Sequence, residues 1–146
     1  MEQFDLIDYI CVNQCIRRGI SKEAAEELRR NHVSHFHILY MALLCKAEGG
    51  LTLSELSSYI GMDRANATRA VADLEKLGFV RREKHKEGEK KYKIVLTEEG
   101  KKIGVQTIAF MRAKAQELVS GLTKEEAEEF FSLIKKQAEY LRHNKE

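Results

Sequence analysis

Apolar residues recur at every third or fourth position between residues 33 and 47. This spacing places them on one face of an α-helix, and it predicts a buried helix that ends at Gly49 and Gly50. Thr52 and Glu55 then form a capping box, which predicts a short helix from residue 53. The predicted buried face of the first helix consists of Val33, Phe36, Leu39, Tyr40, Leu43, Leu44 and Ala47.

A second amphipathic helix is predicted over residues 63–78. Asp63 can cap its start, and Gly78 is placed to end it. Because only Gly61 and Met62 separate this helix from the preceding one, the pair predicts a helix-turn-helix. The face expected to be buried carries Ala67, Ala70, Val71, Leu74 and Leu77, and the other side carries Arg64, Asn66, Thr68, Arg69 and Asp73.

The pattern changes from helix to strand after Gly78. Residues 79–84 and 92–96 are strand-like, and a polar loop around residues 87–89 joins them, which predicts a β-hairpin. Residues 81–93 contain seven Lys or Arg and three Glu, so the hairpin is basic although the whole chain has a net charge of only +2. A basic hairpin directly after a helix-turn-helix is typical of a wing.

Long helices are predicted at both ends of the chain. Residues 4–18 have helical spacing, Gly19 is expected to interrupt it, and Ser21 to start a second run, which allows one bent helix or two. Thr97 caps a helix to about residue 120, with Val105, Ile108, Met111, Ala115, Leu118 and Leu122 on one face, and Thr123 opens a last helix. The remaining chain is too short to cover their apolar stripes, so we expect a homodimer.

The fold class expected from these elements is mainly α with a small β-hairpin wing. We expect one domain over residues 1–146, with a winged helix-turn-helix lobe at 33–100 and dimerisation helices at 1–32 and 101–146. No secretory signal is visible and the longest apolar run, residues 38–45, is too short to span a bilayer, which favours a cytoplasmic protein. Enzyme motifs such as GxSxG, HExxH or a phosphate-binding glycine loop are absent, so neither catalysis nor a cofactor is expected.

Long basic and small polar side chains on the exposed side of residues 63–78 suit a DNA major groove, because they can donate to phosphates and to base edges. The rival within this fold is a winged helix used only for protein contacts. Such a module usually lacks a basic first turn on its second helix, so Arg64 and Arg69 favour double-stranded DNA as the partner.

The chain resembles the MarR family (multiple antibiotic resistance regulators) of bacterial and archaeal transcription factors. The resemblance is carried by residues 51–56, by Asp63-Arg64 with Thr68-Arg69, by residues 74–82 and by residues 96–100. It implies that Arg64, Asn66, Thr68 and Arg69 contact DNA from the recognition helix. The family's Asp-x-Arg at the wing tip falls on Gly88-Glu89-Lys90 here, which leaves phosphate contacts by Lys86, Lys90 and Lys91 as the expectation.

Family members often bind small aromatic or phenolic anions between the dimer helices and the DNA-binding lobe. The resemblance therefore implies an effector site, for which the candidate residues are Tyr9, Arg17, His35 and Tyr40. The implied function is a ligand-responsive repressor, a homodimer on a pseudo-palindromic operator whose half-sites lie about 34 Å apart. An activator or a nonspecific architectural protein is the alternative within the DNA-binding class.

Oxidation of cysteine and binding of zinc are two alternatives to a small aromatic effector. Hydroperoxide-sensing members use a Cys in their first helix, so Cys11 and Cys15 offer a redox-responsive regulator as an alternative. Their helical spacing of about 5–6 Å between Cβ atoms disfavours a local disulfide. His32, His35 and His37 suggest zinc, but residues 101–120 contain no His or Cys to complete the family's zinc site, so no metal is expected.

Overall fold

The protein is described by a computed structural model that covers residues 6–29, 32–84 and 91–144. Helix α1 (Leu6–Leu28) is continuous, so the interruption expected at Gly19 is wrong. A Cβ at Gly19 would meet no atom within 4 Å, so the position is open and the glycine costs only its backbone entropy, about 1 kcal/mol. Ser21 accordingly lies inside α1 and starts no second helix.

The predicted helix-turn-helix is present. A short 3₁₀ turn, η2 (His35–His37), leads into α2 (Ile38–Lys46), and α3 (Leu53–Ile60) and α4 (Arg64–Lys76) follow. The Thr52–Glu55 capping box forms at the start of α3. At the turn between α3 and α4, Gly61 takes a left-handed φ of 72°, which an L-residue rarely adopts. Asp63 caps α4, because its side chain accepts a 2.7 Å hydrogen bond from the backbone N–H of Asn66.

The predicted hairpin consists of β1 (Val80–Glu83) and β2 (Lys93–Leu96), which pair antiparallel with Val80 opposite Leu96. Leu51 extends this sheet through an isolated bridge to Ile94. The base of the hairpin is fastened by Thr97, whose hydroxyl donates a 2.6 Å hydrogen bond to the Gly78 carbonyl and also caps the next helix. The orientation of the hairpin is therefore tied to the end of α4.

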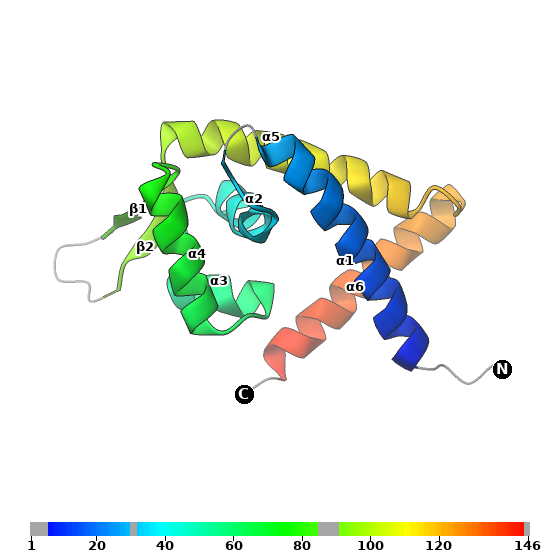
Figure 1. Ribbon diagram of the computed structural model, residues 1–146. Coiled ribbons are helices and arrows are strands. Elements are labelled where there is room, and N and C mark those ends of the chain that lie inside the picture. The colour runs from blue at the N-terminus through cyan, green and yellow to red at the C-terminus, as the bar shows by residue number, and fades with distance from the viewer. Residues whose placement is uncertain (1–5, 30–31, 85–90, 145–146) are drawn as a thin grey trace.

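Helices α5 (Glu98–Leu118) and α6 (Lys124–His143) begin at Thr97 and Thr123 as predicted, the second with a full capping box. In Figure 1, α5 runs along the upper edge of the molecule, above α2, and α6 turns back and crosses α1 in this view. Helix α2 makes its most extensive contact with α5, so the lobe that holds α4 is built onto the first half of α5.

The core lies in the helix-turn-helix lobe, where α4 buries Ala67, Ala70, Val71 and Leu74 as predicted. The predicted face of α2 is wrong in part, because Phe36 and Leu39 are 65% and 46% exposed while Ile38 and Met41 are buried. The physical reason is the 3₁₀ turn before α2. Three residues per turn in place of 3.6 shift the phase with which the helix meets the core.

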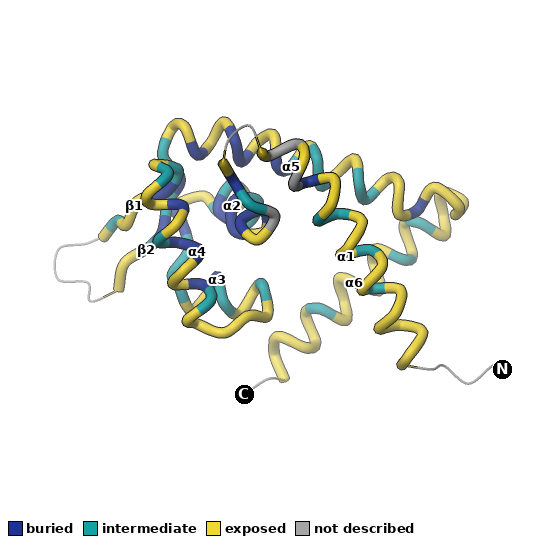
Figure 2. The backbone as a smooth tube through the Cα atoms, viewed as in Figure 1, coloured by how far each residue is buried: buried dark blue, intermediate teal, exposed yellow. Residues whose placement is uncertain are grey.

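The two terminal regions leave much of their apolar surface uncovered. Figure 2 shows α6 and the first half of α1 almost entirely exposed, and α6 buries no residue. Helix α5 buries Ile103, Gly104 and Thr107 against its own lobe, while Val105 and Leu118 of the predicted apolar stripe are 63% and 40% exposed in one subunit. None of the helices in the described part of the chain is long and apolar enough to cross a membrane.

Candidate nucleic-acid interface

The outer side of α4 presents two guanidinium groups. Arg64 and Arg69 are exposed, whereas the opposite side of the helix is fixed in the core by Ala67 and Leu74. Within residues 6–29, 32–84 and 91–144, neither arginine forms an ion pair. The helix therefore holds its arginines at fixed positions on the surface while their donors still face solvent.

The two polar candidates on α4 are already hydrogen-bonded within the protein. The Thr68 hydroxyl donates a 2.8 Å bond to the Arg64 carbonyl, so it closes back onto its own helix. Asn66 is half-buried, and its Oδ1 accepts a 2.9 Å bond from the Tyr40 hydroxyl. Thr68 can still offer its methyl group to a thymine, and Asn66 keeps its NH₂ donors and one lone pair.

The basic residues of the hairpin divide between its two faces. Arg82 lies on the same face as Ile94 and places its Nε 3.4 Å from Glu75 Oε2 of α4. Arg81 lies on the other face and pairs with Glu83 at 3.0 Å. Lys91 is exposed, and Lys86 and Lys90 lie outside the described residues.

A hollow of about 220 Å³ lies between the hairpin and the starts of α3 and α4; we call it the basic hollow. The charge count of the sequence did not identify Arg82 and Ser54 as members of a common site. The alternation of side chains along β1 would have placed Arg82 and Arg81 on opposite faces of the hairpin. The sequence could not show, however, that the start of α3 packs on the face of Arg82. The lining consists of Thr52, Leu53, Ser54, Arg64, Arg82, Lys91, Tyr92 and Ile94.

Two of the four effector candidates meet in one hollow. Arg17 and Tyr40 line a space of about 220 Å³ between α1, α2 and α4, with Phe36, Met62, Asn66 and Met111; we call it the inner hollow. Burial raises the pKa of Tyr40, and the negative charge of Asp63 raises it further. Tyr9 lies instead beside Phe130 and Leu133 of α6, and the His35 side chain is outside the described part.

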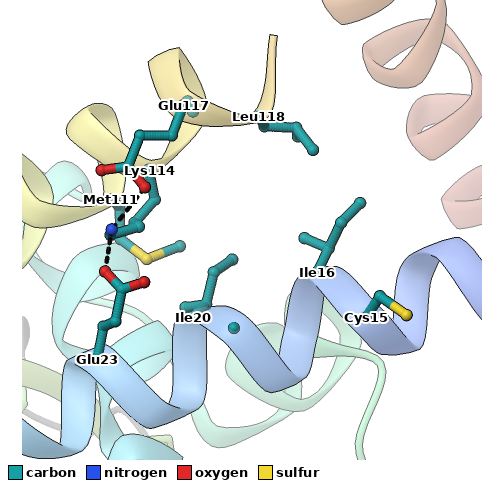
Figure 3. A pocket seen from close by; sticks show the side chains of 10 residues that line it. Cys15, Ile16, Ile20, Glu23, Met111, Lys114, Glu117 and Leu118 are labelled. Carbon is teal, nitrogen blue, oxygen red and sulfur yellow. Dashed lines mark hydrogen bonds and ion pairs between the residues drawn. The ribbon is translucent and has the colours of Figure 1, made fainter. Parts of the chain in front are cut away.

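A further hollow of about 390 Å³ separates α1 from α5 (Figure 3). Lys114 of α5 bridges it by pairing with Glu23 of α1 and with Glu117, and the hydrogen bonds that its ammonium donates to Glu117 and Glu23 raise its pKa. Cys15 lies at the other end of this hollow. Cys11 and Cys15 are exposed, and both are free thiols.

The histidines do not assemble a metal site with other ligands in the part of the chain that the structure describes. His37 is buried, and its Nε2 lies 3.6 Å from Asp73 Oδ2 of α4. Its Nδ1 lies 3.2 Å from the Ser34 hydroxyl. His37 thus joins the start of α2 to α4.

Known proteins share this arrangement. The profile of the MarR family matches residues 33–92. The HTH-type transcriptional regulator PapX of Escherichia coli is 30% identical over 132 residues, which cover 88% of this chain and 80% of PapX. The chain belongs to the MarR family. PrsX of Escherichia coli and BilQ of Clostridium symbiosum, to which the chain is also similar, are HTH-type transcriptional regulators as well.

Solved structures of MarR proteins confirm the winged helix-turn-helix fold. A putative MarR family regulator from Listeria monocytogenes, complexed with 26mer DNA, superposes with a TM-score of 0.81 at 20% identity, covering 97% of this chain and 91% of that chain. CouR from Rhodococcus jostii RHA1, bound to p-coumaroyl-CoA, gives a TM-score of 0.73 at 18% identity, covering 92% and 91%.

Proposed function

We propose that this MarR protein is a homodimeric, sequence-specific repressor that binds a pseudo-palindromic operator and responds to a small ligand. The observation that carries the DNA-binding part is the pair of exposed arginines on α4, which have no ion-pair partner among the described residues. A helix that buries one face and presents Arg64 and Arg69 on the other suits insertion into a major groove.

In this proposal residues 33–100 form the DNA-binding lobe, and residues 1–32 and 101–146 form the dimer. Support for the dimer comes from apolar side chains on α1 and α6 that one subunit leaves exposed: Ile7, Ile10, Leu133, Ile134 and Leu141 are 66%, 50%, 57%, 49% and 47% exposed. Tyr9 of α1 lines one hollow together with Leu133, Ile134 and Leu141 of α6, so the apolar surface continues from one helix to the other, and such a surface marks an interface. A two-fold axis would then hold the two α4 helices about 34 Å apart, one turn of B-form DNA.

The test of DNA binding is a comparison of charge-matched double variants. Arg64→Ala with Arg69→Ala removes two cations from α4, and Arg112→Ala with Lys124→Ala removes two exposed cations from the terminal helices. We expect the first variant to lose at least a hundredfold in operator affinity by fluorescence anisotropy, since each bidentate base contact contributes about 1–3 kcal/mol. Equal losses in the two variants would contradict recognition by α4.

The effector part of the proposal rests on the inner hollow. Arg17 is its single charged lining residue among those described, and the surrounding side chains of Phe36, Tyr40 and Met111 are apolar or aromatic. One cation in an apolar surrounding suits an aromatic carboxylate, and the volume of about 220 Å³ suits a single ring. CouR, which has the same fold, binds an aromatic acyl thioester.

A ligand in the inner hollow would touch Tyr40 and Asn66, and through Asn66 the first turn of α4. It would weaken operator binding only if it binds the DNA-free arrangement more tightly than the DNA-bound one. A thermal-shift screen with aromatic carboxylates tests this. We expect a hit that Arg17→Gln abolishes and that the adjacent Arg18→Gln retains; a screen without a hit, or a hit unaffected by Arg17→Gln, would contradict it.

A further inference from the structure

The basic hollow gathers cationic side chains from three separate elements. Arg64 begins α4, Arg82 belongs to β1, and Lys91 lies just before β2. Ser54, at the start of α3, adds a hydroxyl group, whereas the neighbouring Thr52 hydroxyl donates to Glu55 in the capping box. No carboxylate of the described residues lines the hollow, although Glu75 reaches Arg82 from outside it. Three cations and a hydroxyl donor around one small space form a site for an anion.

We infer that the basic hollow binds one phosphate of the DNA backbone, with Arg82 and Ser54 as its principal ligands beside Arg64. This inference rests on the proposed function, because it requires α4 in the major groove and the hairpin at the adjacent minor groove. Neighbouring grooves of a duplex are separated by one sugar–phosphate strand. That strand must therefore pass between α4 and the hairpin, and the hollow lies in that gap.

Arg82 is held in place for this contact by the Glu75 carboxylate. Glu75 engages Nε at 3.4 Å, and a guanidinium has four further N–H donors on its two terminal nitrogens. A phosphate oxygen pair can accept two of these donors in parallel. Glu75 therefore acts as a positioning residue: it orients the arginine and offsets part of its charge before DNA arrives.

Arg81 provides the contrast within the same strand. It carries the same charge one residue earlier, yet it lies on the opposite face of the hairpin, in a different hollow with Val95 and Lys101, and pairs with Glu83. If only the number of positive charges on the hairpin mattered, the two arginines would be equivalent. If the hollow binds a phosphate, only Arg82 matters.

The experiment compares full-length wild type with Arg82→Ala, Arg82→Met and Arg81→Ala. The probe is a duplex selected by the wild-type protein from a random library, and the dissociation constant is measured over a series of salt concentrations. We expect both Arg82 variants to bind more weakly by on the order of tenfold. Their plots of log affinity against log salt should be shallower by about 0.9 per subunit, whereas Arg81→Ala should run parallel to wild type.

A second arm locates the phosphate. In a set of duplexes, a neutral methylphosphonate replaces one backbone phosphate at a time. At one position in each half-site the replacement should weaken binding of wild type, but it should leave the affinity of Arg82→Ala unchanged. Met preserves the apolar stem of Arg82, and thermal unfolding confirms that each variant is folded.

Three results would overturn the inference while leaving DNA binding intact. The salt dependence of affinity could be unchanged in both Arg82 variants, or it could change equally in Arg81→Ala. The affinity losses caused by Arg82→Ala and by a methylphosphonate could also add at every phosphate position. A wild-type protein that enriches no duplex would instead overturn the proposed function.

Discussion

The Tyr40 hydroxyl donates a hydrogen bond to Asn66 Oδ1 across 2.9 Å, and so joins the wall of the inner hollow to the first turn of α4. Tyr40 is 2% exposed, so this bond is one of the polar contacts at the edge of the core. It also fixes which way the Asn66 amide faces. A residue expected to read DNA from α4 is therefore also a residue of the candidate effector site.

Replacing Tyr40 by Phe tests the value of this bond. We expect Tyr40→Phe to lower the free energy of unfolding by about 1 kcal/mol, the usual loss for one internal hydrogen bond, in urea denaturation. Tyr140→Phe removes the same atom from a tyrosine that is 60% exposed, and it should be neutral. Equal effects of the two variants would show that the bond contributes nothing to stability.

Tyr40 also predicts a change in stability at alkaline pH. Burial raises its pKa above the unfolded value of 10.0, so the folded state holds the phenolic proton more tightly than the unfolded state. Its contribution is complete below pH 10 and is lost as the pH rises through the raised pKa. Denaturation at a series of pH values should therefore show a shallower alkaline decline for Tyr40→Phe than for wild type. Parallel declines would contradict this assignment.

The capping box of α3 predicts an acid-dependent loss of stability. The Thr52 amide donates to Glu55 at 2.7 Å, and this bond lowers the pKa of that carboxyl below 4.5. A lowered pKa stabilises the fold above the unfolded pKa and ceases to do so as the pH falls through the folded pKa. We expect Glu55→Gln to cost about 0.5–1 kcal/mol at pH 7, and the difference from wild type to shrink as the pH falls below 4.5.

Glu99→Gln is the control for this acid titration. Glu99 is also a first-turn carboxylate of a helix, but its side chain is 70% exposed and pairs with Lys102 at the surface. The two variants should therefore differ in chemical denaturation near neutral pH and converge in acid. A Glu55→Gln deficit that stays constant down to acid pH would rule out the capping explanation.

The dimer interface is tested on α6. Leu133 is 57% exposed in one subunit, and the proposed partner would cover it. Leu133→Glu should place a charge in that interface and yield monomers in sedimentation experiments, because an unpaired charge is costly to bury. Ser132→Glu introduces the same charge at the neighbouring exposed position and should remain dimeric. A monomeric wild type would contradict the dimer directly.

Thr68 separates a methyl contact from a hydroxyl contact with DNA. Its hydroxyl is bonded to the Arg64 carbonyl at 2.8 Å, so the methyl group is the part that can meet a thymine. Thr68→Val should therefore keep most of the operator affinity, and Thr68→Ser should lose several-fold at one base position. Affinities measured on operators with single base changes would show the reverse order if the hydroxyl reads the base.

The sequence predicted the parts of the fold that depend on local chemistry. The caps at Thr52, Asp63, Thr97 and Thr123 are hydrogen bonds between residues three positions apart, and all four form. The buried face of α4 followed from a regular period of 3.6. These features need no knowledge of which elements meet.

The errors and omissions arise where tertiary contacts decide. Phe36 is exposed and not buried as predicted, because it lies in a 3₁₀ turn before α2. Gly19 does not interrupt α1, and no neighbouring atom crowds the helix at this position. The sequence grouped Tyr9 with Arg17, but the fold places Tyr9 against α6. Likewise a count of hairpin charges treats Arg81 and Arg82 alike, whereas the packing of α3 and α4 on one face of the sheet distinguishes them.

The most direct test of the account is in vitro selection of duplexes from a random library by the full-length protein, with the Arg64→Ala, Arg69→Ala double variant in parallel. We expect wild type to enrich a pseudo-palindrome whose half-sites lie about 10 base pairs apart, and the variant to enrich nothing. Enrichment of the same motif by both proteins, or of no motif by wild type, would contradict recognition of DNA by paired α4 helices.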